Sequence, residues 1–114
     1  MPETFYRLVR HNPVTREDFL SYADLGIISI DDPPEIRRLK QGISVNRTLR
    51  QAKNRALAVR SLRDHAFIAE LRIPDGAPVR FERTGHQKGH HTLWGDPDDF
   101  VTYVVSVVRV DEVE

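Results

Sequence analysis

The sequence predicts a single α+β domain, residues 1–114, in which a mixed sheet of about five or six strands packs against two main helices. Three observations support this class. The chain has 114 residues with 39% hydrophobic and 30% charged, as expected for one folded domain with one core. Several short segments alternate apolar and polar residues, which is typical of strands. Two further segments begin with helix-capping residues.

The first predicted elements are a strand over residues 4–10 and a helix over residues 16–25. The strand alternates two faces and ends at the turn-forming pair Asn12-Pro13. Thr15 and Asp18 resemble a capping box with Asp in place of Glu, which favours a helix start. A surface loop rich in Asp and Pro is expected next, followed by a short helical turn at residues 35–40.

The second predicted helix extends from Thr48 to about Arg63 and follows a short strand at residues 42–45. Thr48 and Gln51 form a second capping box. The apolar positions lie within a sector about 80° wide at the spacing of an α-helix. We expect that sector to face the core, and its members are Leu49, Ala52, Ala56 and Val59.

The second half of the chain predicts four strands. Residues 66–73 alternate cleanly, and shorter strands are expected at residues 79–83 and 91–94, on either side of a glycine-bounded loop. Asp96 as N-cap and Pro97 at the first helical position predict a helix of one or two turns. Residues 104–110 are apolar on both faces, which predicts a central strand covered on both sides.

Basic residues are concentrated in one segment although the formal net charge is zero. Between residues 37 and 63 there are nine Arg or Lys residues and no Asp or Glu. This segregation predicts a positive field that favours an anionic partner or an acidic surface of the same molecule. Arg47, Arg50 and Lys53 of the second helix are therefore candidate phosphate-binding residues. The alternative is a solvated helix face, and no aromatic residue between Val45 and Phe67 offers a stacking platform.

A loop rich in His and Gly is the second candidate site. Glycine exposes backbone N–H groups to an anion, His86 and His90 can donate to phosphate, and Trp94 can stack on a base or sugar. The alternative is a connecting loop with Trp94 in the core. His90 and His91 point to opposite faces if they lie in a strand, so no preformed three-histidine metal site is expected. Two histidines with Asp96 or Asp98 are the weaker metal alternative.

Arg7 is ambiguous in the sequence. If the strand face with Phe5 and Val9 is buried, the guanidinium needs a partner, either an anionic ligand or a carboxylate such as Glu70 or Glu82. If the opposite face is buried, Arg7 is exposed to water. The sequence leaves both registers open.

Several classes of protein are disfavoured by what the sequence lacks. The chain has no cysteine, which excludes disulfides, thiol nucleophiles and cysteine zinc sites. It shows no signal peptide and no run of about 20 apolar residues, so we expect a soluble cytoplasmic protein with no membrane partner. Walker, nucleophile-elbow, His-Glu-x-x-His and dinucleotide motifs are absent.

The order of elements resembles the compact ADP-ribosyltransferase-like fold, including RES-type toxin domains. The resemblance is carried by the strand with Tyr6-Arg7 and by the Gly42-Ile43-Ser44-Val45 strand that feeds a helix. It implies that Arg7 and Ser44 hold NAD. The family's later Glu is replaced by His90-His91-Thr92, with Glu82 the nearby acid, so the resemblance implies a relative that is inactive or of altered chemistry. The segment 91–97 also resembles small uncharacterised bacterial proteins, which implies no activity.

These observations lead to one predicted function and two alternatives. The main prediction is a binding domain for a phosphate-bearing ligand, a nucleotide-like anion or a nucleic acid, with Arg47, Arg50, Lys53 and the loop from His86 to Trp94 as the site. The first alternative is an enzyme acting on NAD or a nucleotide through Arg7, Ser44, His90 and His91. The second alternative is a protein that docks its basic helix on the acidic surface of a protein partner.

Overall fold

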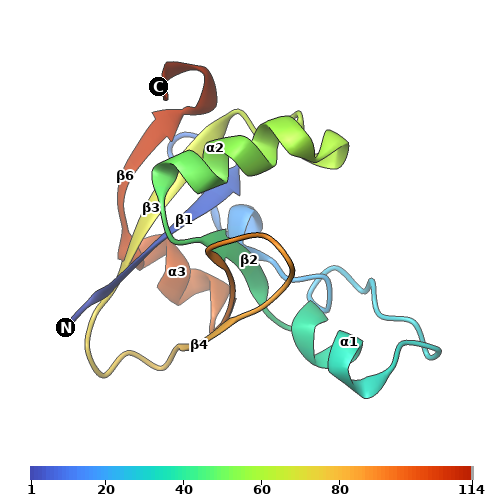
Figure 1. Ribbon diagram of the computed structural model, residues 1–114. Helices are drawn as coiled ribbons and strands as arrows, with labels where there is room; N and C mark the ends of the chain where they lie inside the picture. Colours follow the sequence, from blue (N-terminus) through green and yellow to red (C-terminus); the bar gives the residue numbers. More distant parts are fainter. Residues whose placement is uncertain (114) are drawn as a thin grey trace.

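The computed structural model describes residues 1–113 as a six-stranded sheet with three α-helices, which confirms the α+β class (Figure 1). All strand pairs in these residues are antiparallel, so the sheet is antiparallel rather than mixed. The strand order is β4-β5-β2-β1-β3-β6. The strands are β1 Glu3–Val9, β2 Ile43–Asn46, β3 Phe67–Ile73, β4 Arg80–Arg83, β5 His90–Trp94 and β6 Val104–Arg109.

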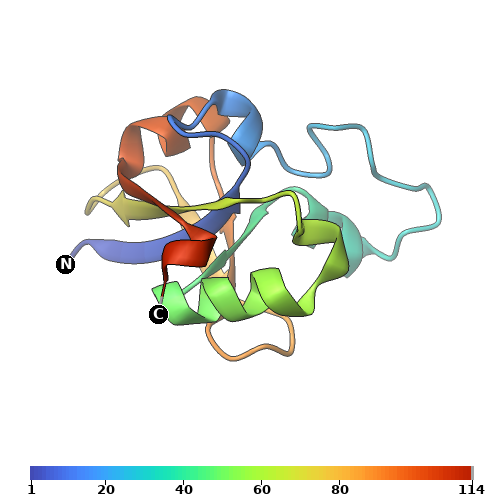
Figure 2. The same cartoon turned by 90° about the horizontal axis from the view of Figure 1, so that it is seen from above.

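The helices cover the two faces of the sheet unequally. Helix α2 (Leu49–Ala58) lies on one face, and α3 (Pro97–Tyr103) with a 3-10 turn at Arg16–Phe19 lies on the other (Figure 2). Helix α1 (Pro34–Lys40) projects beside the end of β2 (Figure 1). No helix within residues 1–113 has the length and apolar character needed to cross a bilayer.

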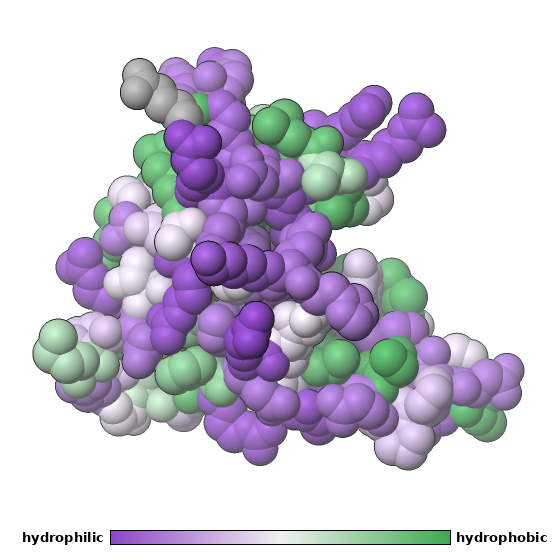
Figure 3. Space-filling view, viewed as in Figure 1, coloured by the Kyte–Doolittle hydropathy of each residue, from purple (hydrophilic) through white to green (hydrophobic). Residues whose placement is uncertain are grey.

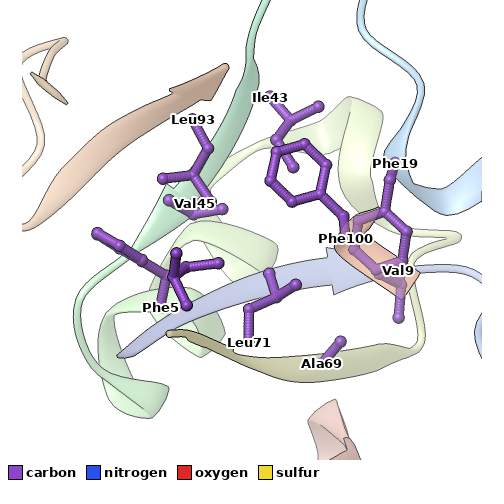
Figure 4. Packing of buried hydrophobic residues seen from close by; sticks show 10 residues of the cluster. Phe5, Val9, Phe19, Ile43, Val45, Ala69, Leu71, Leu93 and Phe100 are labelled. Carbon is purple, nitrogen blue, oxygen red and sulfur yellow. The ribbon is translucent and has the colours of Figure 1, made fainter. Parts of the chain in front are cut away.

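Two hydrophobic cores follow from this arrangement. The larger lies between the sheet and α3, where Phe5, Leu71 and Phe100 are completely or almost completely buried (Figure 4). The smaller lies under α2 and is built on Leu8, Ala52, Ala56, Ile68 and Val113. Because side chains alternate along β1, Phe5 and Val9 enter the larger core and Leu8 the smaller one.

The helix caps predicted from the sequence are present at the starts of α2 and α3. Thr48 and Gln51 form the predicted capping box, with Gln51 N donating to Thr48 Oγ1 at 3.1 Å. Asp96 caps α3 by accepting from Asp98 N at 2.9 Å. Helix α2 ends at Ala58, earlier than predicted, because Val59 is extended and the next turn, Arg60–Leu62, packs Leu62 against the smaller core.

The helix predicted over residues 16–25 is wrong beyond its first turn. Thr15 and Asp18 do form a capping box, but the segment is a four-residue 3-10 turn that ends at Phe19. Asp18 O, which would accept a backbone N–H in a longer helix, accepts instead from Arg7 Nε at 2.8 Å. Leu20 is extended, and the chain leaves the helical path there.

The last strand, β6, is an edge strand, and the prediction of a central strand is wrong. Among residues 1–113 it pairs only with β3, and Val105 is half exposed. Val104 and Val107 pack against the larger core, whereas Val108 packs against the smaller one. Both faces of β6 thus pack against a hydrophobic core, as predicted, although the strand lies at the edge of the sheet.

Candidate ligand-binding site

A cavity of about 320 Å³ lies between α1, α2 and the loop that joins β4 to β5, and we call it the β2–β5 pocket. The surface is hollowed between α2 and α1 (Figure 3). Its apolar wall consists of Tyr22, Ile36 and Leu39. Its polar lining comprises Lys40, Ser44, Arg55, Thr84, His86, Gln87, His90 and Thr92. No carboxylate lines the pocket within the described part of the chain.

Strand alternation places three polar side chains on the pocket floor. Ser44 pairs with Thr92 across β2 and β5, and His90 is two residues from Thr92 on the same face. The intervening residues of both strands, such as Val45 and Leu93, enter the larger core instead. Each of these strands therefore has a polar face toward the pocket and an apolar face toward the larger core, because side chains alternate between the two faces.

Arg7 lies behind the pocket and joins three segments. Strands β1 and β2 pair at a single position, Tyr6 with Asn46, and beyond it the guanidinium bridges the two strands. Arg7 donates to Asp18 O and to Ser44 O, both at 2.8 Å. Both faces of β1 are buried, because Phe5 and Val9 lie in the larger core and Leu8 lies in the smaller one.

Among the described residues, no carboxylate forms a direct ion pair with Arg7. Burial lowers the pKa of Arg7 to about 10, with Arg55 also lowering it and Asp18 and Tyr22 raising it. The side chain is still a cation at neutral pH. The carboxylates suggested by the sequence, Glu70 and Glu82, bond to other groups.

Arg55 is the second guanidinium of the site and projects from α2 into the pocket. Its Nη1 donates to Gln87 Oε1 at 3.1 Å, and no carboxylate of residues 1–113 forms an ion pair with it. Burial lowers the pKa of Arg55, and Tyr22 opposes this change. Lys40, by contrast, bonds to Asp32 at 2.7 Å, and this hydrogen bond lowers the pKa of Asp32.

His90 is buried at the pocket wall with its ring orientation fixed by Thr84. Its Nδ1 lies 2.9 Å from Thr84 O. A carbonyl oxygen can only accept, so the neutral ring has its proton on Nδ1. Burial lowers the pKa of His90, the backbone contact with Thr84 raises it, and Arg55 and His91 lower it. The neutral ring thus leaves Nε2 as a proton acceptor.

The remaining candidates from the His-rich loop do not lie together, and they are His86, His91 and Trp94. His86 lines the β2–β5 pocket and is exposed, whereas His91 lies on the opposite face of β5 and packs against Phe5 with a centroid distance of 5.4 Å. Trp94 contacts the guanidinium groups of Arg38 and Arg80, which lie 4.9 and 5.4 Å from its ring centroid. Its Nε1 donates to Arg38 O at 2.9 Å. Trp94 is therefore a packed residue that does not line the pocket.

The predicted basic residues of the second helix lie outside the pocket. Arg47 bonds to Glu3 at 2.7 Å and covers the ring of Phe5, and Lys53 donates to Val113 O. Arg50 is exposed and lines a separate hollow. The structure does not bring these three cations together with His86 and His90.

Sequence reasoning missed Arg55, Lys40 and the hydroxyls of Thr84 and Thr92 as pocket residues. One signal was present for Arg55, which directly precedes Ala56, a member of the apolar sector that was predicted to face the core. A basic side chain directly beside the apolar sector of a helix lies close to the sheet on which the helix packs. The two threonines gave no signal, since their role depends on how β4 and β5 pair.

Metal ligands are not clustered in residues 1–113, where no group of three His, Asp or Glu side chains could hold an ion. Asp96 caps α3 and Asp98 bonds to Arg16 at 3.1 Å, so the proposed set of two histidines and an aspartate does not form.

Comparisons with protein-family models, with curated proteins and with solved structures give no match to this chain. The arrangement of the pocket is therefore the basis for a functional proposal.

The lowered pKa of His90 predicts a loss of stability on acidification. Below the ordinary histidine pKa of 6.5, the unfolded chain binds a proton that the folded state binds less readily. Stability is therefore full above this value and decreases as the pH falls through it toward the lower folded pKa. We expect a lower melting temperature at about pH 5.5 than at about pH 7.5. The decrease should be smaller in His90→Asn, and an equal decrease would contradict this assignment.

Proposed function

We propose that the β2–β5 pocket binds a small phosphate-bearing ligand. The observation that supports this function is the guanidinium group of Arg55 in a pocket with no carboxylate in its lining, while the second guanidinium, that of Arg7, is bonded to the backbone of the lining residue Ser44. A partly buried cation without a carboxylate gains most from an anion that accepts several hydrogen bonds. Arginine is well suited to phosphate, because its planar fork matches two phosphate oxygens.

The other polar groups of the pocket favour the same ligand class. Ser44, Thr84 and Thr92 supply hydroxyl groups, and Gln87 supplies an amide beside Arg55. The cavity volume of about 320 Å³ is at the lower end of the usual range for small-molecule sites. Tyr22, Ile36 and Leu39 add an apolar wall for the uncharged part of the ligand.

A nucleotide-like anion is favoured over a nucleic acid along α2. Arg47, just before α2, and Lys53, within it, already contact Glu3 and the Val113 carbonyl, so phosphates along this side of the molecule would compete with existing partners. Arg55 has no such competitor within the described residues. The site of binding is therefore assigned to the pocket.

Arg55→Ala is expected to weaken phosphate binding by about tenfold or more, because a hydrogen bond to a charged group is typically worth about 1.5 to 3 kcal/mol. The measurement is isothermal titration of the full chain with inorganic phosphate and with adenosine monophosphate. Arg50→Ala is the matched control, since Arg50 is an exposed cation on the same helix outside the pocket. Equal weakening in both variants would indicate nonspecific attraction and would overturn the assignment.

An enzyme acting on NAD or another nucleotide is the second candidate. It is favoured by the 2.8 Å hydrogen bond from Arg7 to Ser44 O and by the presence of Ser44 and His90 in one pocket. Glu82 bonds to Arg38 at 3.0 Å and does not line the pocket. The test is release of nicotinamide from NAD by the full chain. If the full chain releases no more nicotinamide than the Arg55→Ala variant does, this candidate is contradicted.

A further inference from the structure

The hydrogen bonds of His90 define one reactive nitrogen in the β2–β5 pocket. The imidazole bonds only to Thr84 among residues 1–113, through the carbonyl at 2.9 Å and the hydroxyl at 3.2 Å, both from Nδ1. Thr84 is itself held by Thr92, with 2.7 Å between the two hydroxyl oxygens. The ring is thus fixed in one tautomer, and Nε2 has no protein partner in the described residues.

The surroundings of His90 keep its ring neutral near physiological pH. Arg55 of α2 and His91 of β5 both disfavour a positive charge on it, and burial acts in the same direction. Lys40 of α1 and His86 of the loop also line the pocket, and no carboxylate lining group opposes them. Tyr22 is the remaining titratable group of the lining. A neutral imidazole with a free Nε2 is a proton acceptor.

The donor of the proton must be the ligand. No described side chain donates to Nε2, and Ser44, the nearest hydroxyl-bearing residue of β2 by strand register, makes no hydrogen bond to the ring. The cation Arg55, which lines the same pocket, attracts a phosphate there. A ligand in which a hydroxyl group neighbours a phosphate places both groups in a cavity of this size.

We propose that His90 is the general base for intramolecular cleavage of a phosphodiester that has a neighbouring hydroxyl group. This inference rests on the proposed phosphate site. Nε2 takes the hydroxyl proton, and the hydroxyl oxygen forms a bond to phosphorus while the P–O bond to the leaving alcohol breaks. The products are a cyclic phosphate and the alcohol, whose oxygen takes a proton from water. His90 then returns its proton to solvent, and Arg55 stabilises the charge that develops on the phosphoryl oxygens.

The test uses the full chain with 2-hydroxypropyl 4-nitrophenyl phosphate and follows the release of 4-nitrophenolate. Ethyl 4-nitrophenyl phosphate is the control compound, because it is the same type of diester without the hydroxyl group. We expect the chain to cleave the first compound and not the second. The rate should rise with pH through the titration of His90 and level off above it.

His90→Asn is the decisive variant, because the Asn amide can still donate to Thr84 O but has no nitrogen that accepts a proton. We expect its rate to fall about 100-fold or more, its pH dependence through the histidine range to disappear, and its phosphate affinity to be retained. An unchanged rate in His90→Asn, or equal cleavage of the ethyl diester, would overturn the inference.

The failure of this inference is distinguishable from failure of the phosphate site. If inorganic phosphate binds and the hydroxypropyl diester is not cleaved, the general-base role is overturned and the binding function stands. If inorganic phosphate does not bind at all, both proposals are overturned.

Discussion

Arg7→Met is expected to lower the free energy of unfolding by about 3 kcal/mol, one of the two largest effects for this chain. Arg7 donates to Asp18 O and Ser44 O, both at 2.8 Å, and so ties the 3-10 turn and β2 to β1. Methionine fills a similar volume but leaves both carbonyls without their donor. The cost of an unpaired buried acceptor is about 1 to 3 kcal/mol each. Urea denaturation of the full chain measures the change.

Arg10→Met is the matched control, since Arg10 is the next arginine along the chain and its ion pair with Asp64 is exposed on both sides. Such pairs are worth about 1 kcal/mol or less. If Arg7→Met is no more destabilising than Arg10→Met, then Arg7 does not hold the strands together. Arg7→Lys should be nearly as destabilising as Arg7→Met, because an ammonium group does not span both carbonyls.

Gly42→Ala is expected to lower the free energy of unfolding by about 3 kcal/mol through a steric conflict. A Cβ atom at Gly42 would lie 2.7 Å from Leu93 O and 3.1 Å from Trp94 Nε1, and still closer to the Thr92 methyl group. Because Leu93 O is backbone, the conflict is relieved only if β2 and β5 move apart. Thermal and urea denaturation should both show the loss, and phosphate affinity should fall as the pocket floor is distorted.

Gly76→Ala separates steric contact from backbone strain. Gly76 has a φ of 79° and nothing within 4 Å of an added Cβ, so its variant tests the cost of the left-handed conformation alone. That cost is about 1 to 2 kcal/mol. Gly42 has no positive φ, so its variant tests contact alone. A smaller loss in Gly42→Ala than in Gly76→Ala would contradict the close approach of β2 and β5.

Elements whose signals are local are the ones that sequence reasoning located well. The strand at residues 66–73 alternates because one face meets the larger core, and β3 covers residues 67–73. The caps at Thr48 and Asp96 satisfy the first N–H groups of a helix within a few residues of the chain. Such contacts depend on short spacing and not on distant segments.

Elements that depend on distant partners were predicted less well. The helix expected at residues 16–25 ends at Phe19, and Asp18 O, at the end of this turn, accepts a hydrogen bond from Arg7 of another element. The position of β6 at the sheet edge depends on the pairing order, which is not encoded in the apolar content of residues 104–110. In both cases a tertiary contact outweighs the local preference.

The candidate site shows the same difference between residues with local sequence signals and residues whose position depends on distant contacts. Ser44, His86 and His90 were identified as site residues from their types and spacing, and they do line one pocket. The cations chosen from the sequence, Arg47, Arg50 and Lys53, do not line this pocket. Arg47 and Lys53 find partners within the fold, whereas Arg55 reaches the pocket because α2 crosses the sheet with this flank toward the β4–β5 loop.

Local sequence patterns were sufficient to predict the α+β class, the strand at residues 67–73, the helix starts at Thr48 and Asp96, and the opposite orientations of His90 and His91. Each of these follows from short-range spacing and from the period of two or of 3.6 residues per turn. The cations that are neutralised and the one that faces the β2–β5 pocket could be identified only from the folded arrangement. The ion pairs and hydrogen bonds of Arg7, Arg47 and Arg55 join residues far apart in the chain, and no local pattern specifies them.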